Sequence, residues 1–285
     1  MGVTVKKLLL FLLMGLLVGN AYAEKRLKPK CETAVYADPG EQFGSQCHLM
    51  KQWALSVCLA YVAEDKDATH DAAYTANVLT EIASMDLEEP KKFRLLIRQY
   101  LARDYRTSYF KDVKPPPELN TWKCLDFYDS RKLDALVDRA LKNHEKEGRH
   151  WSRKVVEPEK RLTPECEMAV YDDPKKQLTS NCHLLKRWAM SVCLAYATKH
   201  EEIMLDAMRT AVYHGEAASM SLDESAEFMP LIRRYLAREL KPFHLREVKP
   251  HPEINTGKCL DLFASAELDS LVVRVLKDRE KAGRD

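Results

Sequence analysis

The sequence predicts an all-α protein built from two tandem small helical bundles, each with about four main helices and each held by disulfides. Three observations lead to this prediction. The second half of the chain repeats the first without a gap, at an offset of 135 residues. Apolar residues recur at helical spacing, and only 9 of the 285 residues are glycine. No run alternates apolar and polar residues for long enough to make a sheet.

The duplication is clearest in the cysteines and in the segments around them. The segment YADPGEQFGSQCHLMKQWALSVCLAY of the first half aligns with YDDPKKQLTSNCHLLKRWAMSVCLAY of the second. The four cysteines of the first half are Cys31, Cys47, Cys58 and Cys124, and they return as Cys166, Cys182, Cys193 and Cys259. Each unit has about 130 residues, which is near the usual size of a single-core domain.

The N-terminus has the pattern of a cleavable secretory signal. Lys6 and Lys7 precede the apolar run LLLFLLMGLLV, and the small-residue sequence Ala-Tyr-Ala ends at Ala23. The apolar run is shorter than the ~20 residues that a bilayer span needs. We therefore expect cleavage after Ala23, no membrane anchor after cleavage, and export, with a bacterial periplasm as the best fit.

The remaining chain divides into two units and a charged linker. We expect a signal peptide at 1–23, the first helical repeat at 24–145, the linker at 146–163 and the second repeat at 164–285. Without Lys6 and Lys7, 43 Lys and Arg residues balance 43 Asp and Glu residues. A chain with no basic surplus is a poor ligand for phosphates, which argues against a nucleic-acid partner.

Apolar periodicity locates the helices of the first unit. They are expected near 47–64, 67–84, 87–103 and 121–146. The last one is expected to break near Asp129 and Ser130, with Ser130 as N-cap of its second part. Trp53 and Trp188 fall on an apolar stripe and are expected in the core. The stretch DKDATHDAAYTANVLTEIAS is the least similar between the two copies, so we expect it to pack with few specific demands.

Eight cysteines in an exported protein predict two disulfides in each unit. Cys47 and Cys58 lie on one predicted helix, about 16 Å apart along its axis, which is beyond disulfide reach. Two pairings remain in each unit. We favour Cys31 with Cys47 and Cys58 with Cys124, because the N-terminal segment then closes onto the first helix. The alternative pairs Cys31 with Cys58 and Cys47 with Cys124.

Other chemistry of these side chains has weak support. Cys47 and His48 place two potential zinc ligands side by side, but neighbouring helical residues point about 100° apart. No CxxC, HxxxH or CxxCH spacing occurs, and a nucleophilic cysteine would have to be a free thiolate. We therefore predict no metal, no cofactor and no catalytic residue. His48, the repeated histidine, is expected to cap or pack against the first helix.

The acidic residues that the copies share are scattered over different segments. They are Asp71, Glu81, Glu89, Glu118, Asp126 and Asp134 with their counterparts. A carboxylate pair for acid–base chemistry would have to converge from several helices, and the sequence does not show such convergence. We interpret these residues as parts of solvated helix faces and helix ends.

Two long segments, Asp104–Asn120 and Leu240–Asn255, are neither helical nor short. Prolines 115–117 stiffen the first, which also carries aromatic residues, and a stiff loop loses little entropy when it binds. It is suited to inserting into the cleft of a partner; the alternative is a crossover whose prolines only route the chain. The candidate binding residues are Tyr109, Phe110, Lys114, Pro116 and Glu118 in the first loop and Lys249, His251 and Glu253 in the second.

The runs VCLAY, RLLIRQYLARDY and NTWKCLDFYDSRKLDALV together resemble the type VI secretion system amidase immunity proteins. The second copy has the same elements as VCLAY, PLIRRYLAREL and NTGKCLDLFASAELDSLV, so the resemblance covers 47–142 and 182–277. It implies a small helical periplasmic protein that binds a peptidoglycan amidase toxin. It further implies that a protruding loop, often from a dimer, plugs the cysteine–histidine active site.

The expected function is therefore that of a non-catalytic immunity protein written twice. The gapless duplication suggests the hypothesis that one chain forms an intramolecular pseudo-dimer; a homo-oligomer is the alternative. Both copies, or only one, could bind a toxin. A periplasmic structural or adaptor module that binds another cell-envelope protein is the second functional reading, and a helical hydrolase the third.

Overall fold

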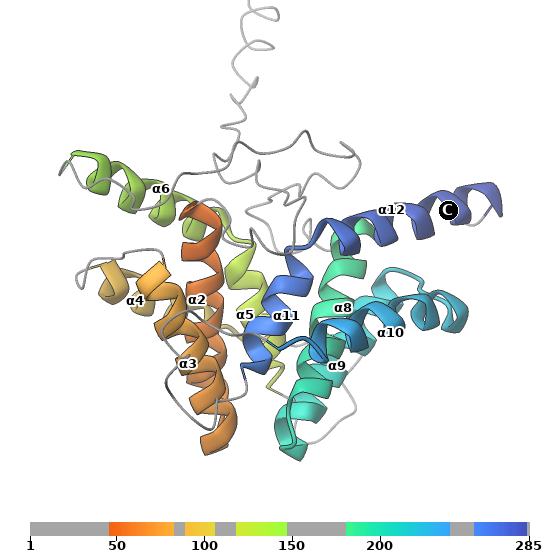
Figure 1. Ribbon diagram of the computed structural model, residues 1–285, viewed down its shortest axis with the longest axis horizontal. Coiled ribbons are helices and arrows are strands. Elements are labelled where there is room, and N and C mark those ends of the chain that lie inside the picture. The colour runs from red at the N-terminus through yellow and green to blue at the C-terminus, as the bar shows by residue number, and fades with distance from the viewer. Residues whose placement is uncertain (1–45, 83–88, 106–117, 147–180, 240–253, 284–285) are drawn as a thin grey trace, which may run out of the picture.

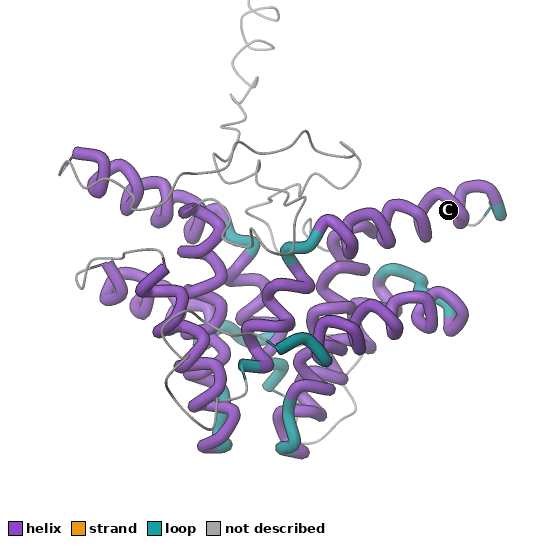
Figure 2. The backbone as a smooth tube through the Cα atoms, viewed as in Figure 1, coloured by secondary structure: helices purple, strands orange, loops and turns teal. Residues whose placement is uncertain are grey.

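The computed structural model describes residues 46–82, 89–105, 118–146, 181–239 and 254–283. All regular secondary structure in these residues is helical (Figures 1 and 2). The fold therefore confirms the all-α prediction and the tandem arrangement of two bundles. No helix in this part of the chain is long and apolar enough to cross a membrane. The predicted signal peptide lies outside the described residues, and so does the predicted linker apart from Lys146, which ends the last helix of the first repeat.

The two repeats contain matching sets of helices. The first has α2 (Gln46–Val62), α3 (Lys66–Ile82), α4 (Glu89–Leu101), α5 (Asn120–Tyr128) and α6 (Arg131–Lys146). The second has α8 (Asn181–Ala197), α9 (Glu201–Ala217), α10 (Leu222–Leu236), α11 (Asn255–Phe263) and α12 (Ala266–Lys281).

The fourth predicted helix is divided into two, at the position that the sequence indicated. α5 ends before Asp129, and the Ser130 hydroxyl accepts a hydrogen bond from the Leu133 N–H at 3.2 Å. In the second repeat Ser265 accepts from the Leu268 N–H at 3.1 Å. A serine N-cap satisfies an N–H group that has no partner within the helix. In both repeats, therefore, the residue after the break begins a new, capped helix.

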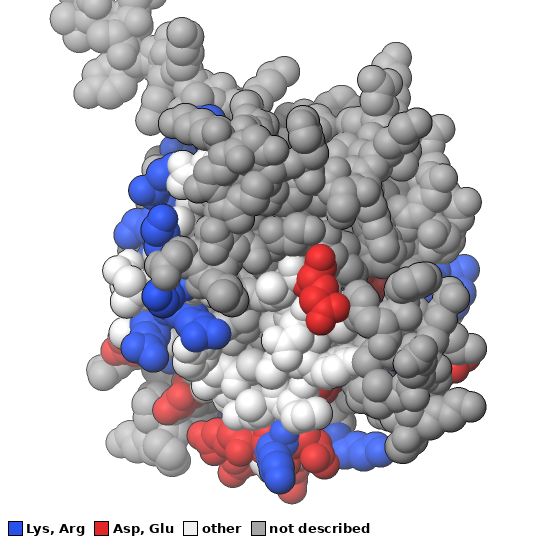
Figure 3. All heavy atoms as spheres, turned by 60° about the vertical axis from the view of Figure 1, so that its left-hand side comes forward, with Lys and Arg blue, Asp and Glu red and all other residues white. Residues whose placement is uncertain are grey.

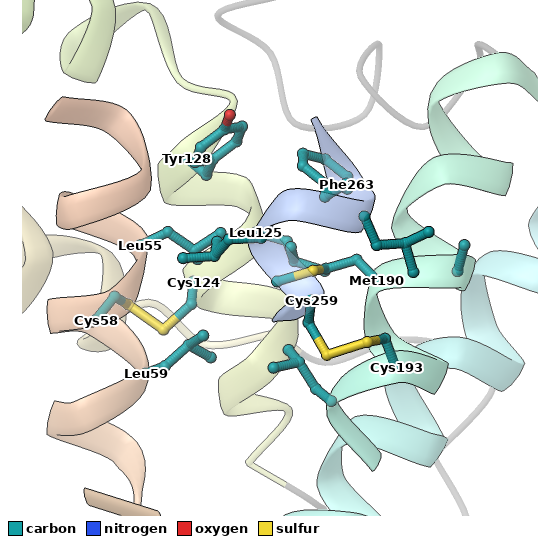
Figure 4. Packing of buried hydrophobic residues seen from close by; sticks show 14 of the residues in the cluster. Leu55, Cys58, Leu59, Cys124, Leu125, Tyr128, Met190, Cys193, Cys259 and Phe263 are labelled. Carbon is teal, nitrogen blue, oxygen red and sulfur yellow. A yellow bond between two sulfur atoms is a disulfide. The ribbon is translucent and has the colours of Figure 1, made fainter. Parts of the chain in front are cut away.

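One disulfide in each repeat joins the first helix to the short central helix (Figure 4). Cys58 bonds to Cys124, and Cys193 bonds to Cys259, with 5.6 Å between the Cα atoms in both cases. This confirms the pairing that we favoured for these four residues. Cys47 and Cys182 are disulfide-bonded as well. Their predicted partners, Cys31 and Cys166, lie outside the described residues.

Each bundle core is built around an edge-to-face aromatic pair. The ring centroids of Trp53 and Phe93 lie 5.4 Å apart, and those of Trp188 and Phe228 lie 5.5 Å apart. Both tryptophans pack in the apolar core, as predicted. Both phenylalanine side chains are fully buried, so the two cores are packed in the same way.

The short helices α5 and α11 lie side by side in the middle of the molecule, with the longer helices on either side (Figure 1). The rings of Tyr128 and Phe263, at the ends of these helices, meet at 5.4 Å (Figure 4). α5 packs against α9 of the second repeat, and α11 packs against α2 and α3 of the first. The two repeats therefore share one continuous core and are in direct contact with each other.

Candidate functional site: the surface between the repeats

An aspartate of the second repeat caps the central helix of the first. Asp206, on α9, accepts hydrogen bonds from the N–H groups of Asn120 and Thr121 at 2.9 and 2.7 Å. It also accepts from the Thr121 hydroxyl at 2.6 Å. The first N–H groups of a helix have no partner inside it, and a carboxylate there also interacts well with the helix dipole. Asp206 therefore acts as an N-cap supplied from the other repeat.

The first repeat returns the same contact. Asp71, on α3, accepts from the N–H groups of Asn255 and Thr256, both at 2.8 Å, and from the Thr256 hydroxyl at 2.5 Å. Burial raises the pKa of both Asp71 and Asp206, although these hydrogen bonds oppose the rise. We call the two aspartates the reciprocal caps. Asn120 and Asn255 end the two predicted loops, so each loop ends where the opposite repeat holds it.

The reciprocal caps correct two interpretations from the sequence. Asp71 is part of a contact between the repeats and not of a solvated helix face. The stretch that contains it, in α3, has specific packing demands because it faces the other repeat. The sequence did contain one indication, because this aspartate is present in both copies of the stretch that is otherwise least similar between them. Nothing in the sequence, however, indicated which residues it would contact.

A buried arginine joins the repeats on one side of this surface. Arg187, on α8, is completely buried, and its Nη1 lies 2.6 Å from Asp126 Oδ1. Its Nε donates to Asp129 Oδ2 at 2.8 Å, and His183 Nε2 lies 2.9 Å from the same oxygen. Asp126 and Asp129 belong to the first repeat. Asp126 was expected on a solvated face, and this was wrong because the carboxylate is the buried partner of a guanidinium.

The charges in this cluster stabilise one another. Burial alone would raise the pKa of Asp129, but its contacts with His183 and with the guanidinium of Arg187 outweigh burial and hold that pKa well below its usual value. The same carboxylates raise the pKa of Arg187 against the effect of its burial. A buried ion pair is tolerated only when its groups are fully partnered, so loss of any one member leaves an uncompensated charge.

The other side of the surface lacks this cluster. The counterpart of Arg187 is Gln52, whose Nε2 donates to the Leu260 carbonyl at 3.5 Å. Asp261 replaces Asp126, and Ala264 replaces Asp129. Among the described residues no ion pair to Asp261 occurs, and burial raises its pKa to about 7, while the charge of Arg238 offsets part of the rise.

The repeated histidines also have different surroundings. His183 faces Asp129, whereas its counterpart His48 has alanine at the equivalent place across the surface. Burial, together with the charges of Lys51 and Lys186, lowers the pKa of His48 to about 3. His48 is therefore a neutral imidazole, and the repeat of this residue in the sequence does not mean a repeat of its contacts.

Among the described residues, an aromatic stack between the repeats is present only on the side of Arg187. Trp122, on α5, stacks on Tyr213 of α9 with 3.9 Å between ring centroids. Tyr105, the second residue of the first predicted loop, packs on the same tryptophan at 5.3 Å. The counterparts of Trp122 and Tyr213 are Gly257 and Val78. Tyr105, at the start of the first loop, and Trp122, just after its end, are thus in contact with each other, and Trp122 also contacts the second repeat.

A groove of about 850 Å³ opens between the repeats at the ends of α2, α3, α8 and α9. Its charged lining is mostly acidic: Glu64, Asp65, Asp67, Asp71, Glu118, Glu202 and Asp206 oppose Lys199 and Arg209. Figure 3 shows acidic side chains gathered at the lower end of the molecule, where α2 and α3 meet in Figure 1. Asn120 and Asn255 also line the groove, so both predicted loops end at it.

Of the predicted binding residues, only Glu118 is among the described residues. Its side chain is exposed, lines the groove and accepts a hydrogen bond from Asn120 Nδ2 at 3.0 Å. The other candidates lie outside the described part of the chain: Tyr109, Phe110, Lys114, Pro116, Lys249, His251 and Glu253. Within the described part, no three His, Cys, Asp or Glu residues are grouped to hold a metal ion.

Comparison with family models identifies what kind of protein carries this architecture. The model of the Tai4 family, described as type VI secretion system (T6SS) amidase immunity protein, matches residues 48–137 and again residues 183–272. The chain belongs to this family. Its two matches coincide with the two helical repeats, so it is a tandem member. No curated protein and no solved structure matches the chain.

Proposed function

We propose that this tandem Tai4 protein is a non-catalytic periplasmic immunity protein that binds and blocks a type VI secreted peptidoglycan amidase. The observation that carries the proposal is the double match to the family. The signal-like residues 1–23 and the disulfides Cys58–Cys124 and Cys193–Cys259 support export to an oxidising compartment. Units 24–145 and 164–285, joined by the linker 146–163, would act in the mature chain.

The proposed means of inhibition is insertion of loop Asp104–Asn120 or loop Leu240–Asn255 into the active-site cleft of the amidase. The reciprocal caps support it, because they fix the end of each loop against the opposite repeat. A binding element that is held before the encounter loses less entropy on binding. Since both loops end at the groove, we propose that the toxin docks on this face.

The test is calorimetric titration of oxidised residues 24–285 with a purified amidase encoded beside this protein, together with an assay of peptidoglycan cleavage. We expect tight binding, and loss of amidase activity in step with it. Glu118→Ala and Lys114→Ala should each weaken binding at least about tenfold, since a few contacts carry most of the binding energy.

The matched control is Lys142→Ala, on the exposed face of α6, where the side chain pairs with Asp138 of the same helix and with no other described residue. Affinity of this variant should equal that of the unchanged protein. Absence of binding by the unchanged protein, with its disulfides intact, would contradict the proposed function. Undiminished binding by the Glu118 and Lys114 variants would remove the first loop from the interface and leave the second loop to be tested through Lys249 and Glu253.

A further inference from the structure

The surface between the repeats has two sides, and they carry different residues at equivalent positions. The charged side consists of Trp122, Asp126 and Asp129 of the first repeat against Arg187 and Tyr213 of the second. The neutral side carries the counterparts of these residues. They are Gly257, Asp261 and Ala264 of the second repeat, against Gln52 and Val78 of the first. Each side is complementary within itself.

A first repeat paired with a second copy of itself would form two mismatched sides. The buried carboxylate of Asp126 would face Gln52, which has no charge to offer, and Asp129 would face Gln52 and His48 in place of Arg187 and His183. Uncompensated charges in a buried site are strongly unfavourable. Trp122 would face Val78 and lose the ring on which it stacks, at 3.9 Å in the native pairing. Such a pair would therefore be disfavoured at both of its sides.

A second repeat paired with itself would be mismatched in the opposite way. Arg187, which is completely buried and now has two carboxylates, would keep a single carboxylate, that of Asp261, because Ala264 replaces the other. Tyr213 would face Gly257, so the space that the Trp122 ring fills would be empty. A cavity and an incompletely paired guanidinium both destabilise a buried surface.

We propose that the surface between the repeats is heterospecific: the first repeat fits the second repeat and excludes a second copy of itself. The reciprocal caps are the same on both sides and so supply affinity without discrimination. The discrimination comes from Arg187, its two carboxylates and the aromatic stack. The surface thereby prevents the first repeat from pairing with the first repeat of another chain. This proposal is independent of any toxin.

The test uses the full mature chain with a protease site placed in the linker 146–163. The protein is folded, cut, unfolded in urea with its disulfides intact and refolded, so that the two fragments choose partners freely. Native mass spectrometry then counts first–second, first–first and second–second pairs. We expect first–second pairs to exceed first–first pairs at least about a hundredfold, in keeping with the cost of unpaired buried charges.

A gain of pairing gives the sharper test. Gln52→Arg places a guanidinium opposite Asp126 and Asp129 in a first–first pair, so such pairs should become at least about tenfold more abundant. Lys142→Arg, an exposed change on α6, should leave the distribution as it was. Arg187→Gln should reduce first–second pairs, and adding Asp126→Asn and Asp129→Asn should restore association without the preference.

Two results would overturn the proposal. One is a statistical mixture of the three pairs from the unchanged sequence. The other is refolded fragments that remain single, because the surface would then select no partner without the linker. If Gln52→Arg leaves first–first pairs as rare as before while the fragments still associate, Arg187 and its carboxylates are not the source of the preference.

Discussion

The interior of each repeat and the surface between the repeats descend from the same duplication, but the interior has kept its main contacts, whereas the surface has kept the reciprocal caps and changed the residues beside them. Inside the first repeat, Lys51 Nζ lies 2.8 Å from Asp134, and inside the second, Lys186 Nζ lies 2.5 Å from Asp269. The disulfides and the tryptophan–phenylalanine pairs are likewise repeated. On the surface between them, by contrast, Arg187 stands opposite two carboxylates on one side and glutamine stands in its place on the other.

The difference follows from which neighbours a residue must fit. A core residue packs against other residues of the same repeat. Because interiors are close-packed, a change of side-chain shape is unfavourable in either repeat. A residue between the repeats meets the other copy, so the two sides can change independently as long as each remains complementary. The reciprocal caps have been kept because the free N–H groups at a helix start need a partner whatever side chains surround them.

The largest expected effect is in the interiors and should be equal in the two copies. Phe93→Ala and Phe228→Ala each remove a fully buried ring, which should lower the free energy of unfolding by about 3–5 kcal/mol. Urea unfolding followed by circular dichroism measures it. Leu222→Ala, at a side chain 89% exposed, is the control and should change little. Strongly unequal losses for the two phenylalanines would contradict the equivalence of the cores.

Arg187→Gln and Gln52→Ala compare how much the charged side and the neutral side each contribute to the free energy of unfolding. Loss of the completely buried guanidinium removes the arginine partner of Asp126 and leaves His183 beside Asp129, and it should cost about 3 kcal/mol of unfolding free energy. Gln52 contributes one long hydrogen bond, so its removal should cost about 1 kcal/mol or less. The same urea titration compares them. Equal losses would mean that the charged side is no more demanding than the neutral one.

Asp261→Asn tests the carboxylate that has no arginine. Burial raises the pKa of Asp261 to about 7 in the folded protein, so the folded state holds this proton more tightly than the unfolded state does. Stability linked to this group is therefore full below about pH 4, falls as the pH rises toward 7 and stays low above it. Asparagine removes the fall. The rise from 3.8 to about 7 corresponds to at most about 4 kcal/mol, and the partial exposure of Asp261 to solvent reduces it, so we expect a gain of about 2 kcal/mol at pH 8.

Urea unfolding of this variant from pH 4.5 to pH 8.5 measures the gain. The control is Asp278→Asn, an exposed position of α12 whose carboxylate pairs only with Lys281. We expect the control to keep the pH dependence of the unchanged protein. An Asp261→Asn variant with that same pH dependence would show that the carboxylate titrates normally in the folded state.

The smallest effect is expected at the reciprocal caps. Asp206→Ala and Asp71→Ala each remove an N-cap and should lower the unfolding free energy by about 1 kcal/mol. The two losses should be equal, because the hydrogen bonds of the two caps match within 0.1 Å. Hydrogen exchange at the N–H groups of Thr121 and Thr256 locates each effect. We expect each mutation to reduce protection in the opposite repeat. Loss of protection only in the repeat that carries the mutation would refute capping between the repeats.

Patterns along the chain were enough to predict the helices, because periodicity and capping act over a few residues. The break before Ser130 and the tryptophans of the core were predicted in this way, and the bond between Cys58 and Cys124 was the favoured one of two pairings. The candidate site was predicted less well. Glu118 alone among its residues is described, and the sequence did not connect it with the groove or with the repeat that closes it.

The sequence by itself determined that this protein is a helical module written twice, since a gapless repeat of cysteines and apolar periods leaves little choice of fold. Only the tertiary structure decided how the copies meet. Asp71 and Asp126 occur as ordinary acidic residues of helices, and their partners stand 185 and 61 positions away in the other repeat. Such contacts depend on the relative placement of two packed bundles, and no local pattern in the chain encodes that placement.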